Sequence, residues 1–323
     1  MGKIRDIRFD TLKGFLILTV VFGHFFTHDA SHGILSEAMA NFIYSFHMPL
    51  FVFISGYFSN NHNVIRGGAK LLETYIVFQL IKGVAYHYSV WWLLFMPGPM
   101  LWYLIALIIW RFGYAAIDKL GIKVTWHLIA FLIFVAIVAG FVPRIGREFA
   151  LSRTIVFAPY FFLGVMAKDM QIIDVLKKKL NWKLCVIILS ISLVTGVLCA
   201  INSIDMRTTF SGTVPYPEEG TWCYAMARLV TYFTSAIFSM AFIRLFSFET
   251  NIFSKIGKDS LKYYMFHGLF LMAVEYLNFP WSTFFAIVYA TVVSVLIFFF
   301  NKTKLSDFAI SPVSFVIDKL KQK

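Results

Sequence analysis

The chain has 323 residues, of which 59% are hydrophobic and only 14% are charged, and its mean hydropathy is +0.74. This composition excludes a soluble globular domain. A net charge of +12 would suit a nucleic-acid-binding protein, but in a hydrophobic chain lysine and arginine concentrate in cytoplasmic loops for reasons of topology. We therefore expect an all-α integral membrane protein, with a single domain over residues 1–323, a lipid bilayer as its surroundings and no nucleic-acid partner.

Ten apolar stretches are long enough to cross about 30 Å of hydrocarbon. They lie near residues 12–27, 39–58, 71–95, 100–117, 126–143, 154–169, 184–201, 221–246, 261–277 and 281–300. Of the lysines and arginines in the connections, 23 fall on the side of the N-terminus and 4 on the opposite side. This bias predicts a bundle of about ten transmembrane helices in the cell membrane, with both termini in the cytoplasm.

The first span, LKGFLILTVVFGHFF, carries Lys13 at its mouth and His24 in its interior. Eleven residues make about three helical turns, so the two side chains share a face and lie about 16 Å apart along the axis. Ionisable side chains within spans are costly and indicate function, although a lysine or glutamate near a span end also has a structural explanation. The other candidates of this kind are His47, Glu73, Lys82, His87, Arg228, His267 and Glu275.

The second span contains SFHMPLFVFISGYF. Pro49 and the Ser55-Gly56 pair predict a kink or a close approach of two backbones. His47 lies towards the outer end of this span, at a depth similar to that of His24 in an antiparallel hairpin. The two histidines would face one cavity unless either turns outward.

Arg66 and Lys70 are neighbours on the surface at the cytoplasmic start of the third span. With Lys13 they predict a cationic funnel at the inner face, suited to a phosphate-rich cytosolic donor. Ordinary anchoring of the spans by positive charge at the cytoplasmic face explains these three residues equally well. Cys185, Cys199 and Cys223 have no CxxC spacing, so we expect no metal.

Several segments together resemble the family-3 membrane acyltransferases, which O-acylate cell-surface carbohydrates. The best match is DTLKGFLILTVVFGH, where a basic residue, ten further residues and a histidine correspond to Lys13 and His24. Lysine replaces the arginine that is usual there, as in the branch similar to fucose 4-O-acetylases. Supporting segments are FHMPLFVFISGYF, MLWYLIALIIWR, LSRTIVFAPYFFLGVMAK and IGKDSLKYYMFHG.

The resemblance implies transfer of an acyl group, usually acetyl, from cytosolic acyl-coenzyme A to a hydroxyl of a cell-surface or lipid-linked carbohydrate, alongside polysaccharide biosynthesis proteins. His24 would be the catalytic residue, as general base or as a transiently acylated nucleophile. Lys13, Arg66 and Lys70 would bind the donor. Substrate-binding or structural roles fall to His47, Ser55, Arg153, Arg228 and His267.

A transporter or flippase for a lipid-linked sugar is the alternative, with the intramembrane charges lining its pathway. It predicts inverted repeats or paired broken helices, which are not evident in the sequence.

Overall fold

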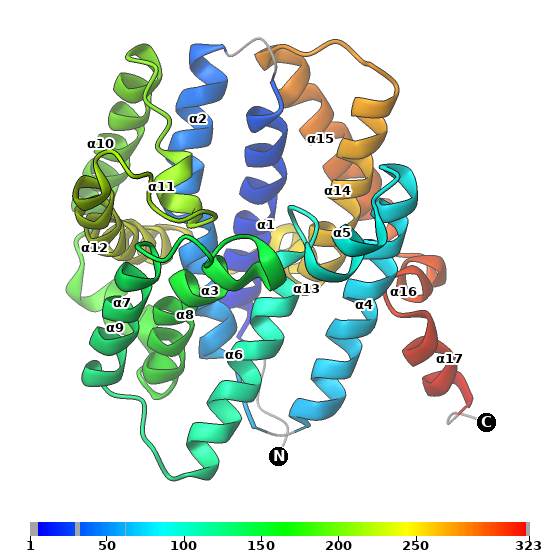
Figure 1. Cartoon of the computed structure of the whole chain (residues 1–323), viewed down its shortest axis with the longest axis horizontal. Coiled ribbons are helices and arrows are strands. Elements are labelled where there is room, and N and C mark those ends of the chain that lie inside the picture. The colour runs from blue at the N-terminus through cyan, green and yellow to red at the C-terminus, as the bar shows by residue number, and fades with distance from the viewer. Residues whose placement is uncertain (1–5, 30–32, 62, 321–323) are drawn as a thin grey trace. The chain divides into compact units, whose positions relative to one another are not determined.

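The computed structural model describes residues 6–29, 33–61 and 63–320, and these are built of helices without a strand (Figure 1). The all-α prediction is therefore confirmed. The chain divides into two compact units, each described here by itself. Unit 1 consists of Met1–Phe51, Gln171–Arg207 and Phe233–Ser306, and unit 2 consists of Val52–Met170, Thr208–Tyr232 and Asp307–Lys323.

Each of the ten predicted spans contains a helix. In chain order the helices are α1 (Ile7–Thr27), α2 (Ile34–Tyr44), α3 (His47–Tyr57), α4 (Val64–Ala85), α5 (Val90–Phe95), α6 (Trp102–Lys119), α7 (Trp126–Ala139), η1 (Glu148–Ala150), α8 (Leu151–Met166), η2 (Ala167–Asp169), α9 (Ile172–Lys179), α10 (Trp182–Ile201), α11 (Arg207–Ser211), α12 (Thr221–Phe246), α13 (Asn251–Lys258), α14 (Ser260–Tyr276), α15 (Thr283–Phe300), α16 (Lys304–Ile310) and α17 (Pro312–Leu320).

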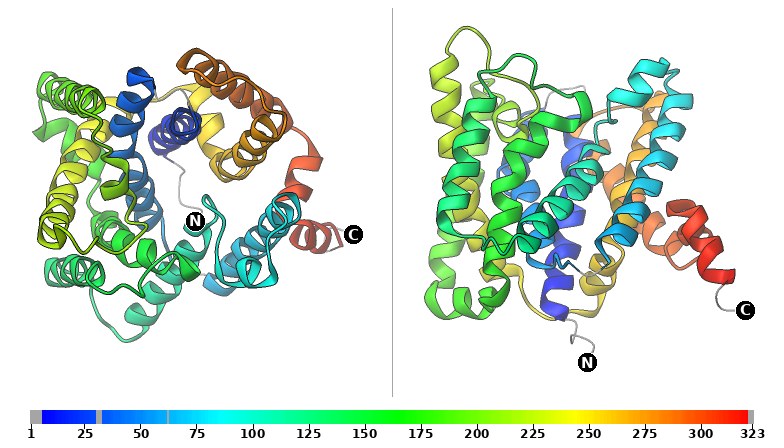
Figure 2. Two further views of the ribbon diagram at one scale, coloured as in Figure 1. Left: turned by 45° about the horizontal axis from the view of Figure 1, so that its top comes forward. Right: turned by 60° about the horizontal axis from the view of Figure 1, so that its bottom comes forward.

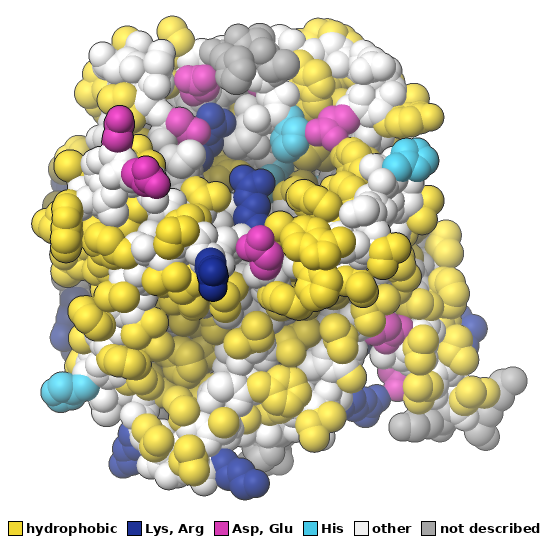
Figure 3. All heavy atoms as spheres, in the orientation of Figure 1, with side chains coloured by type: hydrophobic (Ala, Val, Ile, Leu, Met, Phe, Trp, Pro, Cys, Tyr) yellow, Lys and Arg dark blue, Asp and Glu magenta, His cyan; other side chains and the backbone are white. Residues whose placement is uncertain are grey.

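Six helical segments of the described chain are long and apolar enough by themselves to cross a membrane. They are Ile7–Thr27, Ile34–Tyr57, Glu148–Met166, Trp182–Ile201, Thr221–Phe246 and Thr283–Phe300. Large apolar side chains such as Trp222 and Phe233 are exposed, and hydrophobic atoms dominate the face in Figure 3. Such a surface suits lipid rather than water. The chain is thus a multi-pass membrane protein, while the count of ten spans and the cytoplasmic termini stay predictions.

The predicted span 39–58 is interrupted, and Pro49 explains why. A proline ring clashes with the carbonyl four residues earlier and offers no N–H to it. That carbonyl belongs to Ser45, in the break between α2 and α3. It accepts a hydrogen bond of 2.8 Å from the Ser235 hydroxyl, and the His47 ring supplies another donor at the break, to the carbonyl of Ile43 at 2.7 Å.

The predicted span 71–95 is not one helix, because α4 ends at Ala85 and α5 packs back against α4 (Figure 2). His87, in the connection, has a left-handed φ of 52°. The buried Gln79 amide holds the returning chain. It donates to the carbonyls of Leu93 (3.1 Å) and Met96 (2.8 Å) and accepts from the N–H of Gly98 (3.0 Å).

Helix α1 is the centre of unit 1 and packs against α2, α13, α14 and α15 (Figures 1 and 2). Its contact with α13 brings backbone against backbone. A Cβ atom on Gly257 would overlap the carbonyl oxygen of Asp10, and one on Gly14 would overlap that of Phe253. Beside this crossing the Phe15 and Phe253 rings stack with centroids 3.9 Å apart.

Unit 2 contains a second crossing of this kind. A Cβ atom on Gly56 of α3 would overlap the carbonyl oxygen of Phe161, and one on Gly164 of α8 would overlap that of Phe53. The close approach predicted from the Ser55-Gly56 pair is therefore confirmed. Small residues serve this purpose in membrane proteins because they let helix backbones touch.

Replacing Gly257 by alanine should destabilise the protein, because α13 would have to move away from α1. We expect a loss of about 1–3 kcal/mol, measured as a lowered unfolding temperature of the purified protein in detergent. Gly113→Ala is the matched control, because nothing lies within 4 Å of its added Cβ and alanine favours the helix by up to about 1 kcal/mol. Equal behaviour of the two variants would contradict the close crossing.

Candidate active site

His24 of α1 and His267 of α14 lie side by side in unit 1. Their ring centroids are 5.2 Å apart and their planes are inclined by 32°. His267 is fully buried, whereas His24 is half-buried. The structure thus brings together two histidines that the sequence analysis named separately.

The partner of His267 determines which of its ring nitrogens carries the proton. Nδ1 lies 2.9 Å from the carbonyl oxygen of Tyr263. A carbonyl only accepts, so Nδ1–H must donate, and in the neutral ring Nε2 carries the lone pair. This bond to the preceding turn of α14 also fixes the orientation of the ring against His24.

The C-terminal end of α1 is tied to α14 next to this pair. The His24 carbonyl accepts from the Thr27 hydroxyl (2.9 Å) and from Nδ1 of His28 (2.8 Å). The other ring nitrogen of His28, Nε2, lies 3.1 Å from a carboxylate oxygen of Glu275. These contacts hold the last turn of α1, and with it His24, against α14.

Asp29 follows His24 by five residues in the sequence, and its contacts favour a structural role. The carboxylate is buried and accepts from the hydroxyls of Ser36 (2.6 Å) and Thr283 (3.1 Å). The hydroxyl oxygens of Ser36 and Thr283 also lie 2.9 Å apart. The cluster joins the end of α1 to the starts of α2 and α15.

Lys13 forms an ion pair that the sequence analysis did not anticipate. Its Nζ lies 2.9 Å from Oδ1 of Asp10, which is buried, while the Lys13 side chain is 22% exposed. The i, i+3 spacing of Asp10 and Lys13 could have predicted this pair from the sequence. An ammonium group has three N–H donors, and its positive charge suits an anion.

Arg66 and Lys70 are exposed residues of α4, in unit 2. Nη2 of Arg66 lies 2.8 Å from Oδ1 of Asp318 in α17. An exposed pair of this kind contributes about 0–1 kcal/mol, little enough for a phosphate to displace the carboxylate. The gathering of Lys13 with Arg66 and Lys70 stays a prediction, since Lys13 belongs to unit 1.

Glu73, an ionisable candidate within the third predicted span, holds the start of α17. Its carboxylate accepts from the backbone N–H of Val313 (2.5 Å) and of Ser314 (3.2 Å), and from the Ser314 hydroxyl (2.6 Å). The N–H groups of a first helical turn lack partners within their helix, and a carboxylate there also suits the helix dipole. This environment favours a structural role.

His47 and Ser55 also have partners within their own surroundings. The His47 ring is buried and lies edge-on to Tyr44, with centroids 4.8 Å apart, in addition to its bond to the Ile43 carbonyl. The hydroxyls of Ser55 and the buried Tyr103 share a hydrogen bond of 2.6 Å. Both sets of contacts favour a structural role in helix packing for His47 and Ser55.

Arg228, in unit 2, is buried and binds a carbonyl in the last turn of α7. Its Nη1 donates to the carbonyl of Ala136 at 3.0 Å, and its guanidinium lies 4.5 Å from the centre of the Tyr216 ring. Carbonyls of a last helical turn lack partners and favour a cation. Of the two roles considered for Arg228, these contacts favour the structural one.

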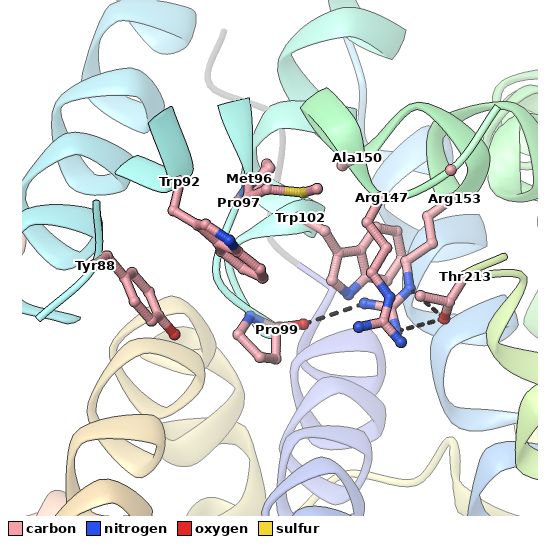
Figure 4. Close-up of a pocket in the computed structure, with 11 residues that line it drawn as sticks. Tyr88, Trp92, Met96, Pro97, Pro99, Trp102, Arg147, Ala150, Arg153 and Thr213 are labelled. Atoms are coloured by element: carbon pink, nitrogen blue, oxygen red, sulfur yellow. Dashed lines mark hydrogen bonds between the residues drawn. The ribbon is translucent and has the colours of Figure 1, made fainter. Parts of the chain in front are cut away.

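Arg153 lines a cavity of unit 2, shown in Figure 4, together with Arg147. Arg147 is not among the site residues predicted from the sequence. The sequence nevertheless held a signal for it, the cluster of arginines in residues 144–153. The positive-inside count places this cluster on the side of the membrane that has few cations.

Comparison with known proteins identifies the family. The family model described as Acyltransferase domain matches residues 6–300, nearly the whole chain. No curated protein and no solved structure matches the chain. The match confirms the resemblance to the family-3 membrane acyltransferases and favours a transferase over a flippase.

The Asp10–Lys13 pair should contribute to stability, because removing either partner leaves the other without its counter-charge in a largely buried place. We expect Asp10→Asn and Lys13→Gln each to lower the free energy of unfolding by about 1–3 kcal/mol, with a coupling energy of about 0.5–3 kcal/mol in a double-mutant cycle. Unfolding is measured in the absence of acyl-coenzyme A. The Asp205–Arg207 pair, whose carboxylate is exposed, is the control, with coupling under about 1 kcal/mol. Additive effects at Asp10 and Lys13 would contradict the pairing.

Proposed function

Because the chain belongs to the family-3 membrane acyltransferases, we propose that it transfers an acyl group, acetyl in the first instance, from cytosolic acyl-coenzyme A to a hydroxyl of a cell-surface or lipid-linked carbohydrate. The observation that carries this proposal is the His24–His267 pair in the contact between α1 and α14. The place of action is the cell membrane, alongside the proteins that build the polysaccharide.

His24 is the proposed catalytic residue. As general base it takes the proton of the acceptor hydroxyl while the oxygen attacks the thioester carbonyl. A C–O bond forms, the C–S bond breaks, and the imidazolium returns the proton to the departing thiolate of coenzyme A. In the alternative route the imidazole itself attacks the thioester, the C–S bond breaks, and the thiolate of coenzyme A leaves with the ring N–H proton. The hydroxyl then attacks the acyl-imidazole, the N–acyl bond breaks, and the hydroxyl proton returns to the ring. Both routes begin with a neutral His24 ring.

His267 is the proposed positioning residue for His24. Its ring is buried, it is held by the Tyr263 carbonyl, and it lies against the His24 ring. A ring fixed in this way limits the orientations of His24. Catalysis depends on such alignment, because small displacements of a reacting group slow the reaction steeply.

Donor binding is assigned to Lys13, Arg66 and Lys70. Coenzyme A carries several phosphate charges, and the ammonium group of Lys13, whose side chain is 22% exposed, suits a phosphate oxygen. Arg66 and Lys70 are exposed on one side of α4. The predicted cytoplasmic location of these cations agrees with a cytosolic donor.

Replacing His24 by alanine should lower acyl transfer by about 10²–10⁴-fold, the usual contribution of an acid–base group. The assay follows labelled acetyl groups from acetyl-coenzyme A into glycan in membranes of a strain that lacks the chromosomal copy. His267→Asn keeps an N–H donor near the Tyr263 carbonyl, so we expect normal expression, a lower kcat, a changed pH profile and an unchanged KM for the donor. Undiminished transfer by His24→Ala at matched expression would remove His24 from the mechanism.

Charge at position 13 should govern donor binding. We expect Lys13→Gln to raise the KM for acetyl-coenzyme A by about tenfold, the effect of losing one charge-assisted hydrogen bond, whereas Lys13→Arg should stay close to the unaltered protein. Initial rates at varied donor concentration and a fixed amount of membrane acceptor provide the measurement. A neutral variant with the original KM would show that Lys13 does not contact the donor.

A further inference from the structure

Unit 2 contains a cavity of about 370 Å³ whose lining combines aromatic and cationic side chains. Tyr88, Trp92 and Trp102 supply the aromatic rings, and Arg147 and Arg153 supply the charges (Figure 4). Among the described residues the lining includes no aspartate or glutamate. The volume lies in the usual range for a small-molecule site.

Arg153 is held in place by hydrogen bonds to neutral oxygens. Its Nε and Nη2 donate to the hydroxyl of Thr213 (3.2 and 2.9 Å), and Nη1 donates to the carbonyl of Pro99 (3.1 Å). The guanidinium also lies 5.0 Å from the centre of the Trp102 ring. Because its orientation is already fixed, this cation would lose little freedom on binding an anion.

Arg147 brings a second positive charge to the same place. Its side chain lines the same cavity as that of Arg153 (Figure 4). Arg147 is exposed and has no carboxylate partner within the described part of the chain. Two guanidinium groups that line one cavity repel each other, and an anion bound there reduces that repulsion.

The backbone between the two arginines is strained. Phe149 and Ala150 have φ angles of 50° and 57°, a region that costs residues with a Cβ about 1–2 kcal/mol each. Strain of this kind persists where the surrounding structure imposes it, and it concentrates at functional sites. Here it lies in the short turn that carries both arginines to the cavity.

The sequence independently marks these residues as unusual. The positive-inside count assigns only four cations to the outer side, and three of them are Arg144, Arg147 and Arg153 in one connection. Topology disfavours positive charge there. A ligand requirement explains why the connection nevertheless keeps it.

We propose that this cavity binds an anionic sugar of the acceptor, with a carboxylate or phosphate between Arg147 and Arg153. Planar guanidinium groups match both oxyanions in a bidentate manner. The C–H face of a sugar ring packs on aromatic rings such as Trp92 and Trp102. The proposal rests on the proposed function, since it names the class of carbohydrate that receives the acyl group.

A binding titration by saturation-transfer NMR on the purified protein in detergent tests the proposal without requiring catalysis. The probes are glucuronic acid, glucose 6-phosphate, glucose and inorganic phosphate. We expect one or both anionic sugars to bind at least about tenfold more tightly than glucose and than inorganic phosphate. Which of them binds identifies the oxyanion as carboxylate or phosphate. Equal binding of glucose, or of phosphate alone, would overturn the proposal.

Variants of the arginine connection locate the binding. Arg147→Gln should raise the Kd of the anionic sugar by about tenfold, Arg147→Lys should restore part of the affinity, and Arg144→Gln is the control, because Arg144 does not line the cavity. Equal weakening by Arg144→Gln and Arg147→Gln would contradict the assignment. Normal acetyl transfer without this binding would overturn the cavity proposal alone, and binding without any transfer would overturn the proposed function alone.

Discussion

The direct contact between the backbones of α1 and α13 is the constraint on which the candidate active site depends. Gly14 and Gly257 allow it, and any larger residue at either position would separate the helices. Asp259 alone separates α13 from α14, so this contact also determines where α14 begins. His24 lies ten residues after Gly14, and His267 lies ten residues after Gly257. The glycine crossing therefore sets the level at which the two histidines meet.

Polar contacts then support both ends of α1. Near the crossing, buried Asp10 pairs with Lys13 within the helix itself, and at the other end His28 pairs with Glu275 of α14. In hydrocarbon no hydrophobic force drives helices together, so close packing at small residues and hydrogen bonds between helices take its place. Unit 2 uses the same means at Gly56 and Gly164. Both crossings keep candidate site residues on elements that are fixed by backbone contact.

Most helices could be predicted from the sequence, because apolar length and the bias of positive charge are local signals. The break at Ser45 was approximately predictable from Pro49, whereas the return of the chain after Ala85 depends on Gln79 contacts that no local pattern shows. In the site, the family motif predicted roles for His24 and Lys13, and the start of the third span predicted one for Arg66. It could not show that His267 contacts His24 or that Asp318 contacts Arg66, because these contacts join segments far apart in the chain.

The central claim is that acyl transfer takes place at the half-buried His24 ring beside the buried His267. Histidine modification by diethyl pyrocarbonate, followed residue by residue with mass spectrometry on the unaltered protein, tests it most directly. The account predicts that residual acetyl transfer falls in proportion to the modification of His24, that acetyl-coenzyme A slows this modification, and that buried His267 reacts later. Complete modification of His24 with transfer undiminished would contradict the account.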